Sequence, residues 1–224
     1  MTGSRGFDDI QAVLFDLDGT LVDSVAQIVE ALLTTLKTYG YEFQPQEIRD
    51  SLGAPFLELI PRLTGASRAE TDGMLHEYQR IYTELHIPNT KPLPYATALL
   101  DSLSSSGRRL AIITSKPEKL GQAVVDAVNW TGYFSVVVGV DTAARPKPAP
   151  DPALHALRVL GVEPQNAVLV GDTEQDMGCG LSSGMRATIG VTGTRNAQIL
   201  WTSGASHVCD NLGEVQRLLM ESGL

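Results

Sequence analysis

Cysteine is scarce in this chain of 224 residues, which contains only Cys179 and Cys209. So sparse a pair does not provide a disulfide framework, and neither cysteine belongs to a Cys-x-x-Cys motif. We therefore interpret both as reduced structural thiols, which excludes the class of small secreted domains held together by disulfides.

Long apolar runs are also missing. No stretch is long enough to span a bilayer as a helix. The first residues, MTGSRGFDDI, lack the apolar run of a signal peptide. We therefore expect a soluble, cytoplasmic protein with no membrane partner.

Positively charged residues are fewer than negatively charged ones. Lys and Arg together number 17 against 26 Asp and Glu, and the formal net charge is −9. Because nucleic-acid binding usually requires a basic surface, we expect no nucleic-acid partner. An anionic small molecule remains possible, since a metal ion, a lysine or main-chain amides can bind it locally.

Apolar residues are plentiful, at 43% of the chain, which is enough for a sizeable core. Short continuous apolar runs, each typical of a strand buried on both faces, occur at 12–15, 110–113, 136–140, 167–170 and 187–191. Helix-like stretches separate the later runs, at 95–105, 119–128, 152–160 and 176–183. This alternation predicts an α/β fold with a doubly wound, Rossmann-like parallel sheet.

The segment after the first run breaks the alternation. It contains no convincing strand between about residues 25 and 86, and its apolar residues recur at helical spacing. We therefore predict an α/β core formed by residues 1–23 and 89–224, with residues 24–88 inserted as a small α-helical cap domain.

The stretch FDLDGTLVDS places Asp16 and Asp18 at the carboxyl end of the first predicted strand. Ligands bind at that edge of open α/β sheets. One carboxylate there can attack phosphorus, and a second can protonate the leaving group and then deprotonate water. Gly19 lets the backbone turn tightly beside a ligand. The alternative is an ordinary acidic turn, because Asp-Gly is a common turn pair.

Three later stretches also follow predicted strands. Thr114-Ser115-Lys116 offers a hydroxyl and free amides for phosphate oxygens, although such residues also cap helices. The segment RPKPAPDP carries Lys147, which could reach the carboxylates, although a proline-dense segment can be a stiff linker. GDTEQD adds Asp172 and Asp176, which could also be acidic residues at a helix N-terminus.

Taken together, the four stretches resemble the motifs of the haloacid dehalogenase-like hydrolase superfamily, in the same order and each at a strand end. The helical insertion resembles that family's cap. Within the superfamily, LVDS, TSKP, RPKPAPDP and GDTEQDM are most similar to the phosphoglycolate phosphatase group.

The resemblance implies catalytic roles. Asp16 is the expected nucleophile, and Asp18 is the expected general acid and base. Thr114 and the main-chain amide of Ser115 bind the transferring phosphoryl group, and Lys147 neutralises charge on Asp16 and on the phosphate.

The resemblance also implies a Mg²⁺ site. Asp16, the main-chain carbonyl of Asp18, and Asp172 are the expected ligands, while Asp176 acts directly or through water or Lys147. Hard oxygen donors suit Mg²⁺, which would offset repulsion between the carboxylates and a phosphate dianion. Gly19 is expected beside the bound phosphate.

We therefore hypothesise a Mg²⁺-dependent phosphatase that hydrolyses a small phosphate monoester, such as 2-phosphoglycolate, through a phosphoaspartate. The expected partner is a small phosphorylated metabolite, and the protein is expected to be a monomer or a homodimer. One alternative is a phosphosugar mutase of the β-phosphoglucomutase type, which would return the phosphoryl group to its substrate. An alternative from another class is a non-catalytic binding or regulatory protein on the same fold.

Substrate selection is expected to involve the cap. Arg49, Arg62 and Arg80 lie in the insertion, where one could clamp a substrate carboxylate or second phosphate. Each could equally belong to a solvated face. The loop at 53–56 either faces the active site, as in capped relatives, or simply connects two helices.

Overall fold

The computed structural model describes residues 6–220 and contains a six-stranded, fully parallel sheet of order β3-β2-β1-β4-β5-β6. The strands are β1 (Ala12–Phe15), β2 (Arg109–Ile113), β3 (Phe134–Val138), β4 (Ala167–Gly171), β5 (Ala187–Val191) and β6 (His207–Cys209). The first strand, β1, lies in the middle of the sheet. Strands β2 and β3 extend the sheet on one side of β1, and β4, β5 and β6 extend it on the other. This doubly wound arrangement confirms the predicted fold class.

Helices cover both faces of the sheet because successive strand side chains point to opposite faces. In β1, Val13 and Phe15 point to one face of the sheet and pack in one hydrophobic cluster. Ala12 and Leu14 point to the other face and pack in a second cluster. One face carries α5 (Ala96–Ser105), α6 (Glu118–Ala127) and α10 (Leu212–Met220). The other carries α7 (Asp151–Leu160) and α8 (Glu174–Ser182), with α9 (Ala197–Thr202) beside β5 and β6. The short 3-10 helix η3 (Pro164–Asn166) leads into β4.

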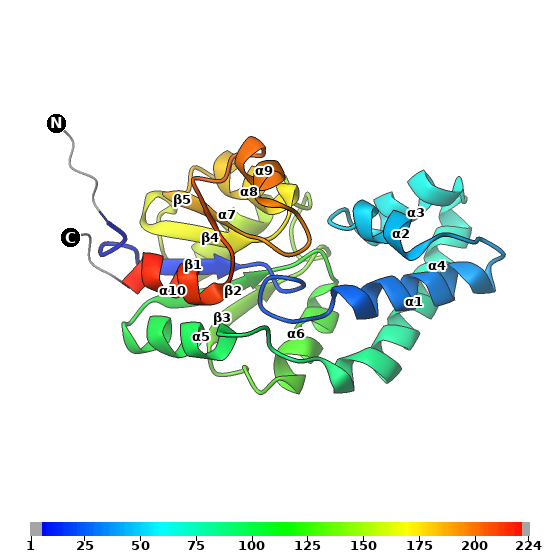
Figure 1. The fold of residues 1–224 in the computed structure, drawn as a ribbon, viewed down its shortest axis with the longest axis horizontal. Helices are drawn as coiled ribbons and strands as arrows, with labels where there is room; N and C mark the ends of the chain where they lie inside the picture. The colour runs from blue at the N-terminus through cyan, green and yellow to red at the C-terminus, as the bar shows by residue number, and fades with distance from the viewer. Residues whose placement is uncertain (1–5, 221–224) are drawn as a thin grey trace.

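The insertion after β1 is entirely helical and forms a small cap beside the core, on the side toward which β1 points (Figure 1). It contains α1 (Val25–Thr38), α2 (Pro45–Ser51), α3 (Phe56–Thr64) and α4 (Arg68–Ile81), followed by the π-helical turn η1 (Tyr82–His86) and the 3-10 turn η2 (Ile87–Asn89). Leu36, Ile48, Ile60 and Met74 are fully buried, so the cap has an apolar interior, which is continuous with the core cluster on one face of the sheet.

The two segments that join cap and core lie side by side. The amide of Asp23 donates to the carbonyl of Lys91 at 2.9 Å, and the amide of Leu93 donates to the carbonyl of Leu21 at 2.8 Å. The chain therefore enters and leaves the cap at one place, next to the end of β1.

Strands β2 and β4 are each one residue longer than predicted, and two other strands differ more from the sequence prediction. The strand expected at 136–140 is β3, Phe134–Val138, so Gly139 and Val140 lie outside it. Since β3 is an edge strand, Ser135 is exposed and the apolar run does not mark where the strand begins. The three residues of β6 were not predicted at all, because a strand so short has no recognisable pattern.

In the described range 6–220, we find no helix with both the length and the apolarity needed to cross a bilayer. The longest helices, α1 and α4, each have 14 residues.

Candidate active site

Three strand ends bring the predicted site residues together. Asp16 follows β1, Thr114 follows β2 and Asp172 follows β4, and these three strands are neighbours in the sheet. The hydrogen bonding between strands continues one residue beyond β1, at Asp16, and one residue beyond β2, at Thr114. The amide of Asp16 donates to Val170 O at 2.9 Å, and that of Thr114 donates to Val138 O at 2.9 Å. Each side chain is therefore positioned by a strand backbone that is itself fixed.

Lys147 binds the carboxylates in the base of the site. Its Nζ lies 2.6 Å from Asp16 Oδ1, 2.6 Å from Asp176 Oδ1 and 3.1 Å from the carbonyl oxygen of Ile113. Its side chain is only 3% exposed. Burial alone would lower the pKa of Lys147, but the two carboxylates outweigh it and raise the pKa. Lys147 therefore stays charged at neutral pH, as its predicted role requires.

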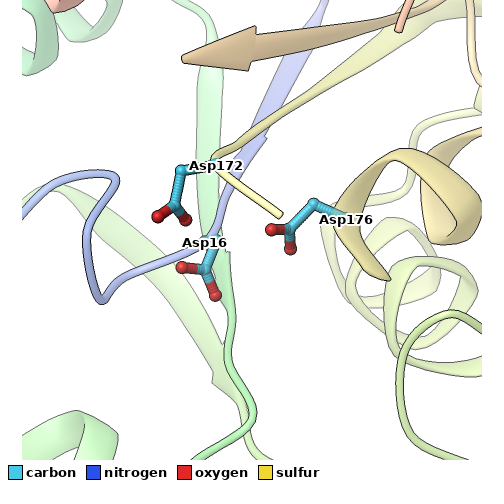
Figure 2. Close-up of side chains that lie close together, drawn as sticks. All are labelled: Asp16, Asp172 and Asp176. Atoms are coloured by element: carbon cyan, nitrogen blue, oxygen red, sulfur yellow. The ribbon is translucent and has the colours of Figure 1, made fainter. Parts of the chain in front are cut away.

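Asp16, Asp172 and Asp176 form a buried carboxylate cluster, shown in Figure 2, with one oxygen from each within 4.8 Å of the others. Burial raises the pKa of Asp16 well above its usual range, and Lys147 opposes this only in part. Burial, together with Asp176, raises the pKa of Asp172 to about 7. The cluster thus contains more acidic groups than one lysine can neutralise.

The same cluster fits a metal ion. Thr20 Oγ1 donates to Asp172 Oδ1 at 2.9 Å, but the buried Asp172 Oδ2 has no hydrogen-bond partner. A buried carboxylate oxygen without a partner is costly. Hard oxygen donors, an excess of negative charge and this one free oxygen together match the requirements of Mg²⁺.

Asp18 lies apart from the cluster and is held by different partners. Its Oδ2 is 2.5 Å from Lys116 Nζ, and its Oδ1 accepts a 2.5 Å hydrogen bond from Ser24 Oγ. Lys116 in turn lies over the ring of Tyr82, 4.5 Å from the centroid. The sequence motifs include Lys116 and Ser24, but neither residue was predicted to have a role in the site. A lysine three residues after the end of β2 was the available signal.

Gly19 occupies a position that only glycine fits. Its φ is +79°, and an added Cβ would lie 2.4 Å from Asp172 Oδ2 and 2.8 Å from Thr194 Oγ1. The backbone after β1 therefore passes directly against the carboxylate cluster.

Polar contacts hold one loop of the cap against the core. Arg195 Nη2 donates to Leu52 O at 2.7 Å and to Asp50 O at 3.3 Å, while Arg195 Nε donates to Glu174 Oε2 at 2.8 Å. Ser115 Oγ also donates to the carbonyl of the next cap residue in that loop, Gly53, at 3.2 Å. We call this group of contacts the Arg195 latch. No motif in the sequence pointed to Arg195.

A cavity of about 120 Å³ lies between core and cap. Its core wall contains Asp16, Asp18, Thr114, Ser115 and Lys147, so these predicted site residues face one space. Asp172 and Asp176 belong to the carboxylate cluster with Asp16 but do not line the cavity themselves. The cap wall is formed by α1, α3, α4 and the loop after α2.

Gly53, Ala54 and Phe56 of the loop at 53–56 belong to that cap wall. The loop thus faces the site and does more than connect two helices. The cap arginines do not line the cavity within the described residues; Arg80, for example, pairs with Glu77 and Glu84 on the surface.

Known proteins resemble this chain along most of its length. A family model described as haloacid dehalogenase-like hydrolase matches residues 13–190. Phosphoglycolate phosphatase of Aquifex aeolicus is 36% identical over 197 residues, covering 86% of this chain and 85% of that protein. Pyrophosphatase PpaX of Bacillus velezensis is 32% identical over 197 residues, covering 86% and 84%. The structure of a haloacid dehalogenase-like family hydrolase from Streptococcus pneumoniae aligns with a TM-score of 0.82 at 27% identity, covering 92% of this chain and 97% of that one.

Proposed function

This chain belongs to the haloacid dehalogenase-like hydrolases, in the phosphoglycolate phosphatase-like group, and we propose that it hydrolyses a small phosphate monoester through a phosphoaspartate on Asp16. Membership of this group makes it a phosphoric monoester hydrolase and agrees with the family resemblance of its motifs. One observation carries the proposed mechanism. Asp16 lies in the cavity wall with a permanently charged lysine 2.6 Å from one oxygen, at the strand edge that also presents Thr114.

In the first step, a carboxylate oxygen of Asp16 attacks phosphorus and the bond from phosphorus to the leaving oxygen breaks. Asp18 enters this step protonated and gives its proton to the leaving alkoxide. The hydroxyl of Thr114 and the amide of Ser115 bind phosphoryl oxygens, and Lys147 balances the growing negative charge. The products of this step are an alcohol and a phosphoaspartate.

In the second step, water attacks the phosphorus of the phosphoaspartate. Asp18, now a carboxylate, accepts a proton from the water, and the bond between phosphorus and Asp16 breaks. Phosphate leaves and Asp16 is regenerated. Before either step, one oxygen of Asp18 must be free to carry the proton, so substrate entry has to break the contact of Oδ1 with Ser24, while Lys116 stays on Oδ2.

We propose that Asp16, Asp172 and the main-chain carbonyl of Asp18 hold Mg²⁺, with Asp176 fixed against Lys147 behind them. When bound, Mg²⁺ would supply positive charge to the phosphoryl oxygens during in-line transfer. Support comes from the carboxylate excess and from Asp172 Oδ2, which lacks any other partner.

We also propose that residues 24–88 move as a cap over a core of residues 1–23 and 89–224, of which 1–5 and 221–224 lie outside the described residues. The two link segments near Asp23 and Lys91 are the natural hinge, because the chain passes between core and cap at one place, where these segments hydrogen-bond to each other. Closure would exclude bulk water during transfer, and opening would admit the substrate. Because several relatives are named phosphoglycolate phosphatases, 2-phosphoglycolate is the first compound to assay.

The decisive variant is Asp16→Asn, which keeps the shape of the side chain but removes the nucleophile. We expect Mg²⁺-dependent phosphate release from 4-nitrophenyl phosphate to fall by at least about 10⁴-fold, as for the loss of a nucleophile in other enzymes. The matched control is Asp8→Asn, which changes an exposed carboxylate ahead of β1 and should leave the rate unchanged. A rate in Asp16→Asn near that of the control would rule out the phosphoaspartate mechanism.

A further inference from the structure

The cap wall of the cavity is apolar. Side chains from three cap helices and from the loop after α2 meet there, and the larger ones are Ile28, Leu32, Leu52, Phe56, Leu59 and Leu75. Phe56 also packs against Tyr78, with ring centroids 5.2 Å apart. Together they give the cap wall an apolar surface in the same cavity as Asp16.

Charged groups are confined to the opposite wall. Among residues 6–220, the cations that line the cavity are Lys116 and Lys147, and every cap residue in the lining is uncharged. Lys116 is already paired with Asp18, and Lys147 with Asp16 and Asp176. No lysine or arginine is therefore left for a second anionic group on a substrate.

Tyr78 adds one hydroxyl to the cap wall but no charge. Burial raises the pKa of Tyr78, so its phenol stays protonated at neutral pH. It can donate one hydrogen bond but cannot replace a cation.

The core wall is therefore suited to the phosphate of a substrate, and the cap wall is suited to the group attached to that phosphate. With the phosphate bound at Asp16, the group attached to it must point toward Ile28, Leu59 and their neighbours. A carboxylate or second phosphate there would lose its hydration without gaining a counter-ion, which is strongly unfavourable. A hydrocarbon group would bury apolar surface on both sides of the contact.

We propose that the physiological substrate is a phosphate monoester of a small apolar alcohol, whose alkyl or aryl group packs against the cap. This inference rests on the proposed phosphatase function and narrows its substrate class. A cavity of about 120 Å³ suits a short alkyl group or a single ring. By this argument 2-phosphoglycolate and inorganic pyrophosphate, whose leaving groups are charged, are poor substrates.

The test compares two compounds of the same size and branching but different charge. Isobutyl phosphate and 2-phosphoglycolate have the same number of non-hydrogen atoms, but two methyl groups in the first replace the two carboxylate oxygens of the second. With the full-length enzyme and Mg²⁺, we expect kcat/KM for isobutyl phosphate to be higher by at least about 10²-fold, since even one methylene changes selectivity in an apolar pocket by about 10- to 200-fold. Benzyl phosphate should also be accepted, and pyrophosphate should not.

A charge placed in the cap wall should reverse this preference. Ile28 is only half-buried on α1, so Ile28→Lys can place its ammonium group in the cavity. We expect this variant to lose at least about tenfold in kcat/KM for isobutyl phosphate and to gain for 2-phosphoglycolate. The matched control is Leu85→Lys, which adds the same charge at a cap position that is 59% exposed and outside the cavity. That variant should behave like the wild type with both compounds.

The outcomes separate the substrate class from the mechanism. Equal or higher kcat/KM for 2-phosphoglycolate in the wild type, still abolished by Asp16→Asn, overturns the apolar substrate and leaves the phosphatase proposal standing. Release of phosphate that survives Asp16→Asn, or no release from any compound, overturns the phosphatase proposal itself. The wild-type comparison decides the substrate class even if Ile28→Lys does not fold.

Discussion

The two walls of the cavity are built on different physical principles. The core wall relies on ion pairs and hydrogen bonds of 2.5 to 3.1 Å that come from adjacent strand ends. The cap wall relies on apolar side chains from helices, whose contacts have no fixed direction. Phosphoryl transfer needs groups at set distances, whereas recognition of a hydrocarbon group needs only a matching shape. The difference explains why the core carries the recognisable motifs and the cap does not.

The largest effect is expected from removing Lys147, the cation of the core wall that pairs with Asp16. Lys147→Met should lower kcat/KM by at least about 10³-fold, because the charge on Asp16 and on the phosphate loses its nearest counter-charge. The metal-free protein should also lose roughly 3–5 kcal/mol of stability in urea unfolding, since buried carboxylates are left without a partner. Lys119→Met removes an exposed lysine and serves as the control. Similar losses in the two variants would refute the specific role of Lys147.

A second variant tests how closely the core backbone must approach the carboxylates. Gly19→Ala would place a Cβ 2.4 Å from Asp172 Oδ2, and we expect kcat/KM to fall by about 10²-fold with weaker activation by Mg²⁺. Gly65→Ala is the matched control, because Gly65 also has a positive φ, +71°, but has nothing within 4 Å of an added Cβ. If both variants lose activity equally, backbone strain rather than the contact with Asp172 is the cause.

A smaller effect is expected where the core holds the cap. Arg195→Gln removes the guanidinium group of the Arg195 latch, so the closed arrangement should be less populated. We expect KM to rise about tenfold while kcat changes less, because charged hydrogen bonds of this kind contribute about 1.5–3 kcal/mol. Arg186→Gln, which breaks an ion pair with Asp9 on the far side of the core, is the control. An unchanged KM in Arg195→Gln would show that the latch does not influence closure.

The sequence reveals the core wall because each site residue follows an apolar run. Asp16, Thr114 and Asp172 stand directly after β1, β2 and β4, and parallel strands end at one edge of the sheet. Periodicity therefore predicts both the fold and the meeting of these side chains. Lys147 is different, because its proline-dense segment could equally be a stiff linker, and the family resemblance decided between that reading and a lysine that reaches Asp16.

The contacts between the domains could not be predicted in this way. Lys116 meets Asp18 beneath Tyr82, a residue of the cap, so that arrangement depends on how the two domains pack. Arg195 lies in a loop after β5 with no periodic pattern, and its acceptors on the cap are more than 140 residues earlier in the chain. Local sequence patterns hold no information about such distant pairs.

The Arg195 latch has a consequence for protein engineering. Its guanidinium binds the main-chain carbonyls of Asp50 and Leu52, and Ser115 likewise binds the carbonyl of Gly53. Every amino acid provides that carbonyl, so the acceptors persist when the side chains at positions 50 and 52 are exchanged. Gly53 is the exception, because its φ of +114° and the side chain of Gln175 leave no room for a Cβ. The cap can therefore be redesigned for new leaving groups while its attachment to the catalytic core is inherited intact.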